Sequence, residues 1–203
     1  MGRGLFVVFE GIDASGKSTQ ARRAAELRDA HFTFEPGDTP LGAELRRWLL
    51  DAHTPMSPVT EALMMLADRS HHVRTLIEPL RASGRAVVSD RFFASTLTYQ
   101  GYGRGVDLDE LRAATALAIG DCRPDLTVLL DVGLEVAHGR RTRDAADRFE
   151  SADLEFHHRV REGYLSLAAE HSDDWVVVDG SGEEAAVAAV VDAHLDRLDW
   201  SNG

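Results

Sequence analysis

The stretch that decides the fold of this chain reads Gly11-Ile12-Asp13-Ala14-Ser15-Gly16-Lys17-Ser18-Thr19. An apolar run at residues 5–9 precedes it, and a stretch typical of a helix follows at residues 20–27. A buried strand therefore runs through a tight glycine turn into a helix. This order of elements is the context that a phosphate-binding loop (P-loop) requires.

The residue types of this loop suit the binding of a di- or triphosphate. Gly11 and Gly16 let backbone N–H groups curl around the phosphates, and the helix that starts at Lys17 adds the positive end of its dipole. The Ser18 hydroxyl is placed to ligate Mg2+. We therefore predict that this loop, with a Mg2+ ion, holds a nucleotide.

The composition draws attention to Lys17. The chain holds 22 Lys plus Arg residues, and Lys17 is its only lysine, so the other 21 (22 minus 1) are arginines. A compact ammonium is kept at the one place where a planar guanidinium would not replace it between phosphates.

The composition also limits the class of protein. The chain has 203 residues, of which 44% are hydrophobic, which predicts a single domain over residues 1–203. The formal net charge of −12 opposes binding to nucleic acid or to a membrane surface. One cysteine, Cys122, and the lack of a leader or of an apolar run of spanning length predict a cytoplasmic protein.

Five apolar runs alternate with helical segments, and parallel strands need such long connections. We therefore predict a three-layer α/β fold with a five-stranded parallel sheet and helices on both faces. The predicted strands are residues 5–9, 31–34, 86–89, 126–131 and 175–179. After the P-loop helix, the predicted helices are residues 41–51, 58–80, 108–120, 134–142, 154–170 and 183–198, and residues 99–105 are predicted to be a glycine-rich loop.

Ligands bind at the carboxyl ends of the strands in such a sheet. These ends bring Glu35, Asp90 and Arg91 to the edge where the P-loop lies. Further arginines are expected near this edge, at Arg46 and at Arg140, Arg141, Arg143 and Arg148. Transfer of a phosphoryl group between two anionic nucleotides needs such guanidinium groups, because its catalysis is mostly positioning and charge neutralisation.

Several motifs identify the family that the chain resembles. They are Phe9-Glu10-Gly11-Ile12-Asp13, Glu35-Pro36-Gly37 with Thr39, Ala67-Asp68-Arg69, Asp90-Arg91-Phe92 with Ser95, Tyr99-Gln100-Gly101, Pro124-Asp125-Leu126-Thr127, Leu130-Asp131-Val132 and Asp147-Arg148-Phe149-Glu150. With them the chain resembles the bacterial thymidylate kinases, P-loop nucleoside monophosphate kinases that move the γ-phosphate of ATP onto dTMP. The resemblance implies the P-loop kinase fold, the substrates ATP and dTMP, the product dTDP and the cofactor Mg2+.

The resemblance also implies how the sugar and phosphate of the acceptor would be held. Arg46 and Arg91 would grip the phosphate, as a bidentate guanidinium can. Asp13 would hold the 3'-hydroxyl of the sugar. Tyr99 would lie where a 2'-hydroxyl would otherwise go, which favours deoxyribose.

Arg69 and Gln100 would address the exposed edge of thymine. A guanidinium only donates hydrogen bonds, whereas an amide both donates and accepts them. The other residues that the resemblance assigns to the acceptor are Glu35, Met65 and Ser95.

On the donor side, the resemblance implies that ATP is bound by Gly11, Ile12, Asp13, Ala14, Ser15, Gly16, Lys17, Ser18 and Thr19, together with Arg140. Ser18 and Asp90 would hold Mg2+, with Asp90 acting through water. Residues of about 140–151 correspond to the lid that closes over ATP. Ala14 and Ser15 carry no charge, so the arginine for the transition state should come from the lid, as Arg143 or Arg148. The predicted catalytic residues are Lys17, Asp90, Arg91, Arg143 and Arg148.

Three positions depart from the family pattern. The family commonly has arginine where this chain has Phe34, so one contact on the phosphate side is missing or comes from elsewhere. Asp38 stands in place of a glycine and adds a negative charge near an anionic substrate. Met65 replaces a phenylalanine that stacks on thymine, and a thioether orients a ring less firmly.

Two other functions remain open on the sequence alone. The three departures would permit a kinase for a different nucleoside monophosphate. A nucleotide-binding switch that acts through a partner protein is the other, although it would leave Arg46, Arg69 and Arg91 without a role. The resemblance also suggests a homodimer that forms through helices remote from the lid.

Overall fold

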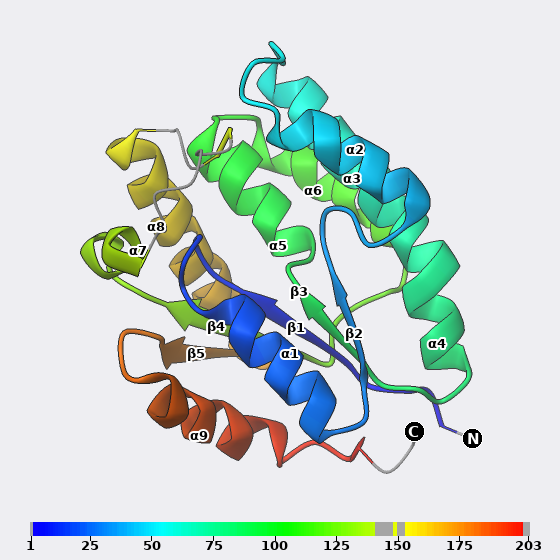
Figure 1. Cartoon of the computed structure of the whole chain (residues 1–203). Coiled ribbons are helices and arrows are strands. Elements are labelled where there is room, and N and C mark those ends of the chain that lie inside the picture. The colour runs from blue at the N-terminus through cyan, green and yellow to red at the C-terminus, as the bar shows by residue number, and fades with distance from the viewer. Residues whose placement is uncertain (1, 141–147, 150–152, 201–203) are drawn as a thin grey trace.

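The computed structural model describes residues 2–140, 148–149 and 153–200. A five-stranded parallel sheet forms the middle layer (Figure 1), in the spatial order β2-β3-β1-β4-β5. The strands are β1 (Phe6–Glu10), β2 (His31–Phe34), β3 (Val87–Asp90), β4 (Leu126–Asp131) and β5 (Trp175–Asp179). The predicted sheet is confirmed, and only the bounds of β1 and β3 differ, each by one residue.

The central strand is buried on both faces. Every residue of β1 is buried, and successive side chains of a strand point to opposite faces. Phe6 and Val8 accordingly belong to one apolar cluster, whereas Val7 and Phe9 belong to a second. A parallel sheet with both faces covered is the arrangement that produces such an unbroken apolar run.

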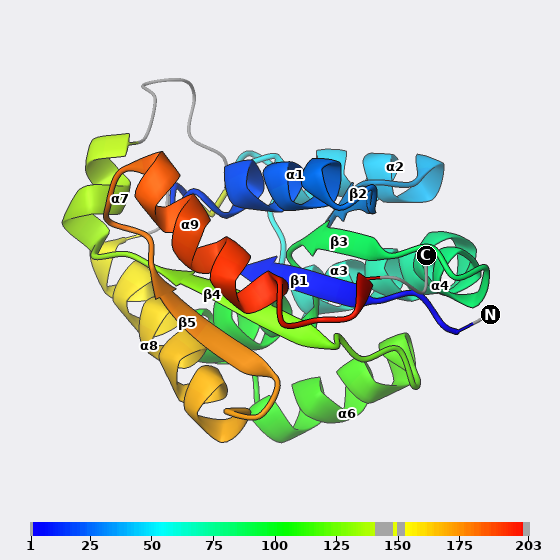
Figure 2. The same ribbon diagram turned by 90° about the horizontal axis from the view of Figure 1, so that it is seen from below.

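Helices cover the two faces of the sheet (Figure 2). On one face lie α1 (Lys17–Leu27) and α9 (Glu184–Leu195), and on the other lie α6 (Leu108–Ile119) and α8 (Leu154–Glu170). Two further helices are α2 (Pro40–Leu50) and α7 (Leu134–Arg140). The bounds of α8 are those predicted, and those of α1, α2, α6 and α9 differ by one to three residues, because the ends of helices are weakly marked in a sequence. Residues 141–142 of the predicted helix 134–142 lie outside the described residues. None of the described helices is long and apolar enough to cross a membrane.

The predicted long helix at residues 58–80 has three parts. They are α3 (Pro58–His72), the π-helical turn η1 (Val73–Ile77) and α4 (Glu78–Ala82). Pro79 lies in the first turn of α4. Because proline has no N–H to donate, the wider turn just before it takes up the change in hydrogen bonding.

The prediction of a loop at residues 99–105 is wrong for residues 99–103. The short helix α5 (Phe93–Thr96) continues into a second π-helical segment, η2 (Leu97–Gly103). Its glycines allow close packing: a Cβ atom on Gly101 would lie 2.5 Å from Leu108 Cδ2, and one on Gly103 would lie 2.5 Å from Phe156 Cε2. These glycines therefore bring η2 against α6 and α8.

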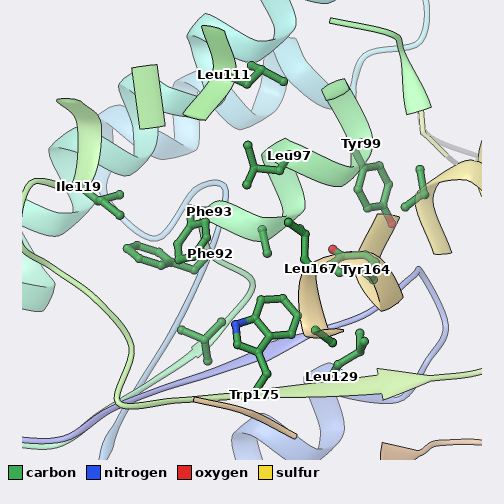
Figure 3. Packing of buried hydrophobic residues seen from close by; sticks show 14 of the residues in the cluster. Phe92, Phe93, Leu97, Tyr99, Leu111, Ile119, Leu129, Tyr164, Leu167 and Trp175 are labelled. Atoms are coloured by element: carbon green, nitrogen blue, oxygen red, sulfur yellow. The ribbon is translucent and has the colours of Figure 1, made fainter. Parts of the chain in front are cut away.

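The larger apolar cluster lies between the sheet and this helical layer (Figure 3). Leu129 and Trp175 from the sheet pack with Leu97 of η2 and with Tyr164 and Leu167 of α8. The two tyrosines of this cluster, Tyr99 and Tyr164, are both buried. The core therefore fixes two hydroxyl groups near the carboxyl ends of the strands.

Replacing Gly103 with alanine should destabilise the protein, because the added Cβ would overlap Phe156 and Val160. We expect the free energy of unfolding to fall by about 1–3 kcal/mol, the usual cost of overpacking, as measured by urea denaturation. Gly139→Ala is the matched control, since no heavy atom lies within 4 Å of a Cβ there. A Gly103→Ala protein as stable as the wild type would contradict the close packing of η2.

Candidate active site

The P-loop has the backbone that its glycines predict. Gly11 has φ 144°, Ala14 has φ 62° and Gly16 has φ 91°, all in the region that disfavours a side chain. A Cβ on Gly11 would lie 2.6 Å from the carbonyl oxygen of Leu130. Glycine is therefore required at residue 11 for a close approach as well as for its φ angle.

Lys17 begins α1 and is 5% exposed. Its Nζ lies 3.4 Å from the Ile12 carbonyl oxygen and 3.9 Å from Asp13 Oδ1, and both contacts are long. Burial lowers the pKa of Lys17, and the charge of Arg91 lowers it further. An anion bound in the loop would offset both effects.

Arg91 connects the P-loop to the acceptor side of the site. It follows β3 with φ 74°, a conformation that costs energy in any residue except glycine. Its Nη2 donates to Asp13 Oδ1 at 2.6 Å and to the Tyr99 hydroxyl at 3.2 Å. Its Nη1 donates to Ser95 Oγ at 3.0 Å and to the Tyr164 hydroxyl at 3.1 Å. These contacts hold the guanidinium in one orientation.

Glu10 supports this arrangement, a role that the sequence did not reveal. Its carboxylate is fully buried and accepts hydrogen bonds from Phe92 N at 2.9 Å, Ser95 Oγ at 2.7 Å and the Tyr164 hydroxyl at 2.9 Å. Burial raises the pKa of Glu10. The signal available in the sequence was an acidic residue at the end of an otherwise apolar strand.

One cavity is lined by all nine residues that were predicted to hold the acceptor. They are Asp13, Glu35, Arg46, Met65, Arg69, Arg91, Ser95, Tyr99 and Gln100. Leu50 and Phe149 line the same cavity and add apolar surface. We call this space the acceptor cavity. Its three arginines face one space, although they come from three separate segments.

A second cavity, the donor cavity, also borders the P-loop. Ala14, Ser15, Gly16 and Thr19 line it, together with Arg140 and the segment after β5. Arg140 Nη1 donates to the Gly180 carbonyl at 2.8 Å. The predicted ATP residues Gly11 and Ile12 do not line either cavity.

A third space, the junction cavity, adjoins the acceptor cavity, since Arg46 and Arg91 line both. It is lined by Lys17 and Ser18 of the P-loop and by Asp90 and Arg91 at the end of β3. The Oδ1 atom of Asp90 is buried and, within the described part of the chain, has no hydrogen-bond partner. Three of the residues predicted to act on the transferred group, Lys17, Asp90 and Arg91, thus meet in one place.

Arg148, one of the two arginines predicted to act from the lid, does not line any of these three cavities. Arg148 Nε donates to the Leu49 carbonyl at 3.1 Å, and its Nη2 donates to the carbonyls of Asp51, at 2.7 Å, and Thr54. These carbonyls belong to the end of α2 and the turn after it. Arg143 lies outside the described residues, as does most of the predicted lid.

The structure shows what surrounds Phe34, the first departure from the family pattern. The Arg46 guanidinium lies over the Phe34 ring at 5.6 Å, and Phe34 stacks on Phe32 at 6.5 Å. Arg22 lies over the Phe32 ring at 4.1 Å, and both arginines line the junction cavity. Arg22 was missed, but its place one helical turn after Ser18 was a signal for it.

Asp38, the second departure, does not line any of the three cavities. Its Oδ2 accepts a hydrogen bond from Thr33 Oγ1 at 2.6 Å. The expected repulsion of an anionic substrate is thereby reduced.

A buried polar network lies beneath the acceptor cavity. Arg69 Nε donates to Glu35 Oε2 at 2.7 Å, and His72 Nδ1 lies 2.9 Å from Glu35 Oε1. Arg69 also donates to Thr96 Oγ1 at 2.7 Å. Burial and the nearby Glu35 charge raise the pKa of Asp68 to about 6. The network fixes the Arg69 guanidinium from behind.

Comparison with known proteins agrees with this site. A family model described as "Thymidylate kinase" matches residues 9–191. The chain belongs to this family. The thymidylate kinase of Geobacter sulfurreducens is 46% identical over 209 residues, covering 96% of this chain and 98% of the relative. The thymidylate kinase of Halothermothrix orenii is 43% identical, covering 90% of this chain and 92% of the relative.

A solved thymidylate kinase has the same fold as this family member. The crystal structure of the Ehrlichia chaffeensis enzyme matches with a TM-score of 0.80 at 30% identity, covering 96% of this chain and 99% of that one. The predicted family and the P-loop kinase fold are therefore confirmed.

The raised pKa of Asp68 predicts how the stability of this thymidylate kinase family member depends on pH. Between the ordinary value of 3.8 and about 6, the unfolded chain has released a proton that the folded chain still holds. Stability is therefore lost across this window as pH rises. Asp68→Asn should remove that slope and raise the free energy of unfolding at pH 7 by on the order of 2 kcal/mol.

The measurement is urea denaturation at a series of pH values. Asp109→Asn serves as the control, because the Asp109 side chain is 94% exposed. If Asp68→Asn kept the wild-type dependence on pH, the assignment of the slope to Asp68 would be wrong.

Proposed function

We propose that this protein transfers the γ-phosphate of ATP to the phosphate of dTMP, which gives ADP and dTDP, a step in the synthesis of dTTP. One observation carries the proposal: the P-loop lines all three cavities. The junction cavity shares Arg46 and Arg91 with the acceptor cavity, and its Lys17 and Ser18 stand in the chain between Gly16 and Thr19, which line the donor cavity. Two nucleotides bound there would place their phosphates end to end. A switch that only binds a nucleotide would need no acceptor cavity.

Cationic side chains at the junction supply the electrostatic part of the reaction. Lys17, Arg22, Arg46 and Arg91 all line this space. Their charges offset the repulsion between two anionic substrates and stabilise the negative charge on the phosphoryl group in transfer. Lys17 reaches the phosphates of the donor, and Arg46 and Arg91 hold the phosphate of the acceptor.

We further propose that Mg2+ is held by Ser18 and Asp90. A hydroxyl and a carboxylate suit this ion, which usually keeps several waters and takes its other ligands from phosphates. The buried Asp90 Oδ1, which lacks a hydrogen-bond partner among the described residues, is an acceptor available to a water of the ion. When bound, the ion would neutralise charge on the phosphates of ATP.

The acceptor cavity suits a deoxynucleotide. The Tyr99 hydroxyl donates to Asp13 Oδ2 at 2.8 Å, and Tyr99 is 5% exposed, so its ring fills space beside the sugar position. Met65, Leu50 and Phe149 provide the apolar walls that a pyrimidine ring needs. Phe149 compensates in part for the missing phenylalanine at residue 65.

The lid is part of the proposal. We assign residues 140–151 of this single domain to a lid over ATP, and we assign the transition-state arginine to Arg143 or Arg148. Arg148 would first have to leave the three carbonyls that it now contacts. Closure of the lid on ATP is a motion that could supply this exchange of partners.

We propose that the protein works as a homodimer in the cytoplasm. Large apolar side chains are exposed on α2, α3 and α6, which pack on one another. Examples are Leu63 at 58% and Leu117 at 81% exposure. A second copy would cover such surface. The lone thiol of Cys122 suits a reducing compartment.

A screen of acceptors tests the proposed activity. With ATP and Mg2+, we expect ADP to form with dTMP, and at least tenfold more slowly with dCMP or dGMP, because their base edges present other donors and acceptors. Lys17→Ala should reduce turnover by 100-fold or more while its circular dichroism stays that of the wild type. Formation of ADP without an acceptor, or an equal rate on all acceptors, would count against dTMP kinase activity.

Sedimentation tests the dimer. We expect twice the mass of one chain at micromolar concentration, and we expect Leu117→Asp to shift the protein towards monomer, because a buried charge without a partner opposes association. Val190→Asp is the matched control, because Val190 is also an exposed apolar residue, at 48%, but belongs to α9 on the other face of the sheet. A wild-type protein that sediments as a monomer would refute the dimer.

A further inference from the structure

Gln100 lines the acceptor cavity from η2, although only 1% of its surface is exposed. Its Nε2 donates to Oε1 of Glu61, on α3, at 2.9 Å. A carboxylate has no proton to donate, so the amide nitrogen of Gln100 has to face Glu61. The amide oxygen, on the other side of the amide carbon, is left for the cavity.

Glu61 is itself held in place. Its side chain is 3% exposed, and the Arg104 Nε lies 3.4 Å from the same oxygen that accepts from Gln100. The Arg104 guanidinium lies over the Phe156 ring at 4.8 Å. A buried carboxylate with a fixed cation beside it is costly to rotate or to leave without a partner. The contact with Gln100 is therefore a constraint and not a chance approach.

We propose that Glu61 is a positioning residue that sets which end of the Gln100 amide faces the acceptor base. By this means the site selects bases with an N–H group at position 3 of a pyrimidine ring, as in thymine and uracil. The inference rests on the proposed function and deepens it, because it names a residue outside the cavity wall that determines the choice of base.

Arg69 supplies the other half of the selection. A guanidinium can only donate, and Arg69 is fixed by Glu35, Thr96 and the Phe92 carbonyl. The cavity thus presents a hydrogen-bond acceptor from Gln100 and a donor from Arg69. Thymine matches both with its N3–H and its O4.

Cytosine opposes the same pair of groups. It has a lone pair at N3, which would face the Gln100 oxygen, and an amino group at C4, which would face the Arg69 donors. Buried polar groups left without partners are the main source of strong discrimination in such sites. If the Gln100 amide were free to turn over, its N–H would meet the cytosine N3, and part of this discrimination would be lost.

The test is a variant in which the side-chain amide of Gln100 is free to rotate. Glu61→Gln keeps the size of the side chain, and the new amide can both accept and donate hydrogen bonds. Gln100 can then face the cavity with either its amide oxygen or its amide nitrogen. We expect the ratio of kcat/KM for dTMP to that for dCMP to fall about tenfold, while the ratio for dTMP to dUMP stays unchanged. Both substrates of the second pair carry the N3–H group.

Glu170→Gln is the matched control. It also neutralises a glutamate held by an arginine, Arg112 at 3.0 Å, but on the surface and away from the cavities. We expect this variant to keep the wild-type ratios. If Glu61→Gln instead lowered kcat/KM for dTMP and dCMP by the same factor, Glu61 would have a structural role only, and the proposal would be overturned.

The exchanged pair E61Q/Q100E provides a second test that does not depend on the folding of E61Q alone. It keeps one amide and one carboxylate in the buried contact, but exchanges their positions. The carboxylate at residue 100 then faces the base, and it can only accept hydrogen bonds. We expect it to prefer dTMP over dCMP at least as strongly as the wild type does, and a loss of this preference would overturn the proposal. A wild-type protein inactive on dTMP would instead refute the proposed function.

Discussion

The ion pair between Arg91 and Asp13 joins two segments that lie 78 residues apart in the chain. One segment is the P-loop and the other is the end of β3, so this contact at 2.6 Å ties the donor side of the site to the acceptor side. It holds Arg91 in a backbone conformation, φ 74°, that few side chains tolerate. Glu10 stabilises the same region through Phe92 and Ser95. The site therefore depends on a guanidinium that the fold has already oriented.

The distribution of charge explains how an acidic protein can bind two anions. The chain has a formal net charge of −12, yet the four cations Lys17, Arg22, Arg46 and Arg91 line one space, where they outnumber the three carboxylates of Asp13, Glu35 and Asp90. Charges in a cleft act over a few ångströms, whereas charge elsewhere on the surface is screened by salt. The local arrangement therefore decides binding at the junction. The overall negative charge instead opposes binding to large anionic surfaces, such as nucleic acid or a membrane.

Much of the fold could be predicted because its signals are local. The P-loop lies between a strand and a helix, and five apolar runs alternate with helices. The nine acceptor residues were found through the family resemblance, and all of them line one cavity. The glycines at 101 and 103 were misread as marks of a loop, because close packing against Leu108 and Phe156 is visible only in three dimensions. Glu61 was missed for the same reason, because its contact with Gln100 joins residues 39 positions apart. Arg22, one helical turn after Ser18, could have been found from the sequence.

The single lysine has a practical consequence. Reagents that methylate or acylate amines can modify only two groups in this chain, the α-amine and Lys17, because arginine does not react with them. An isotope-labelled methyl group on Lys17 would therefore give one spectroscopic signal from the centre of the P-loop, with no other side chain to obscure it. The same amine is 5% exposed, so its rate of labelling would report how often the loop opens and how firmly a bound nucleotide shields it.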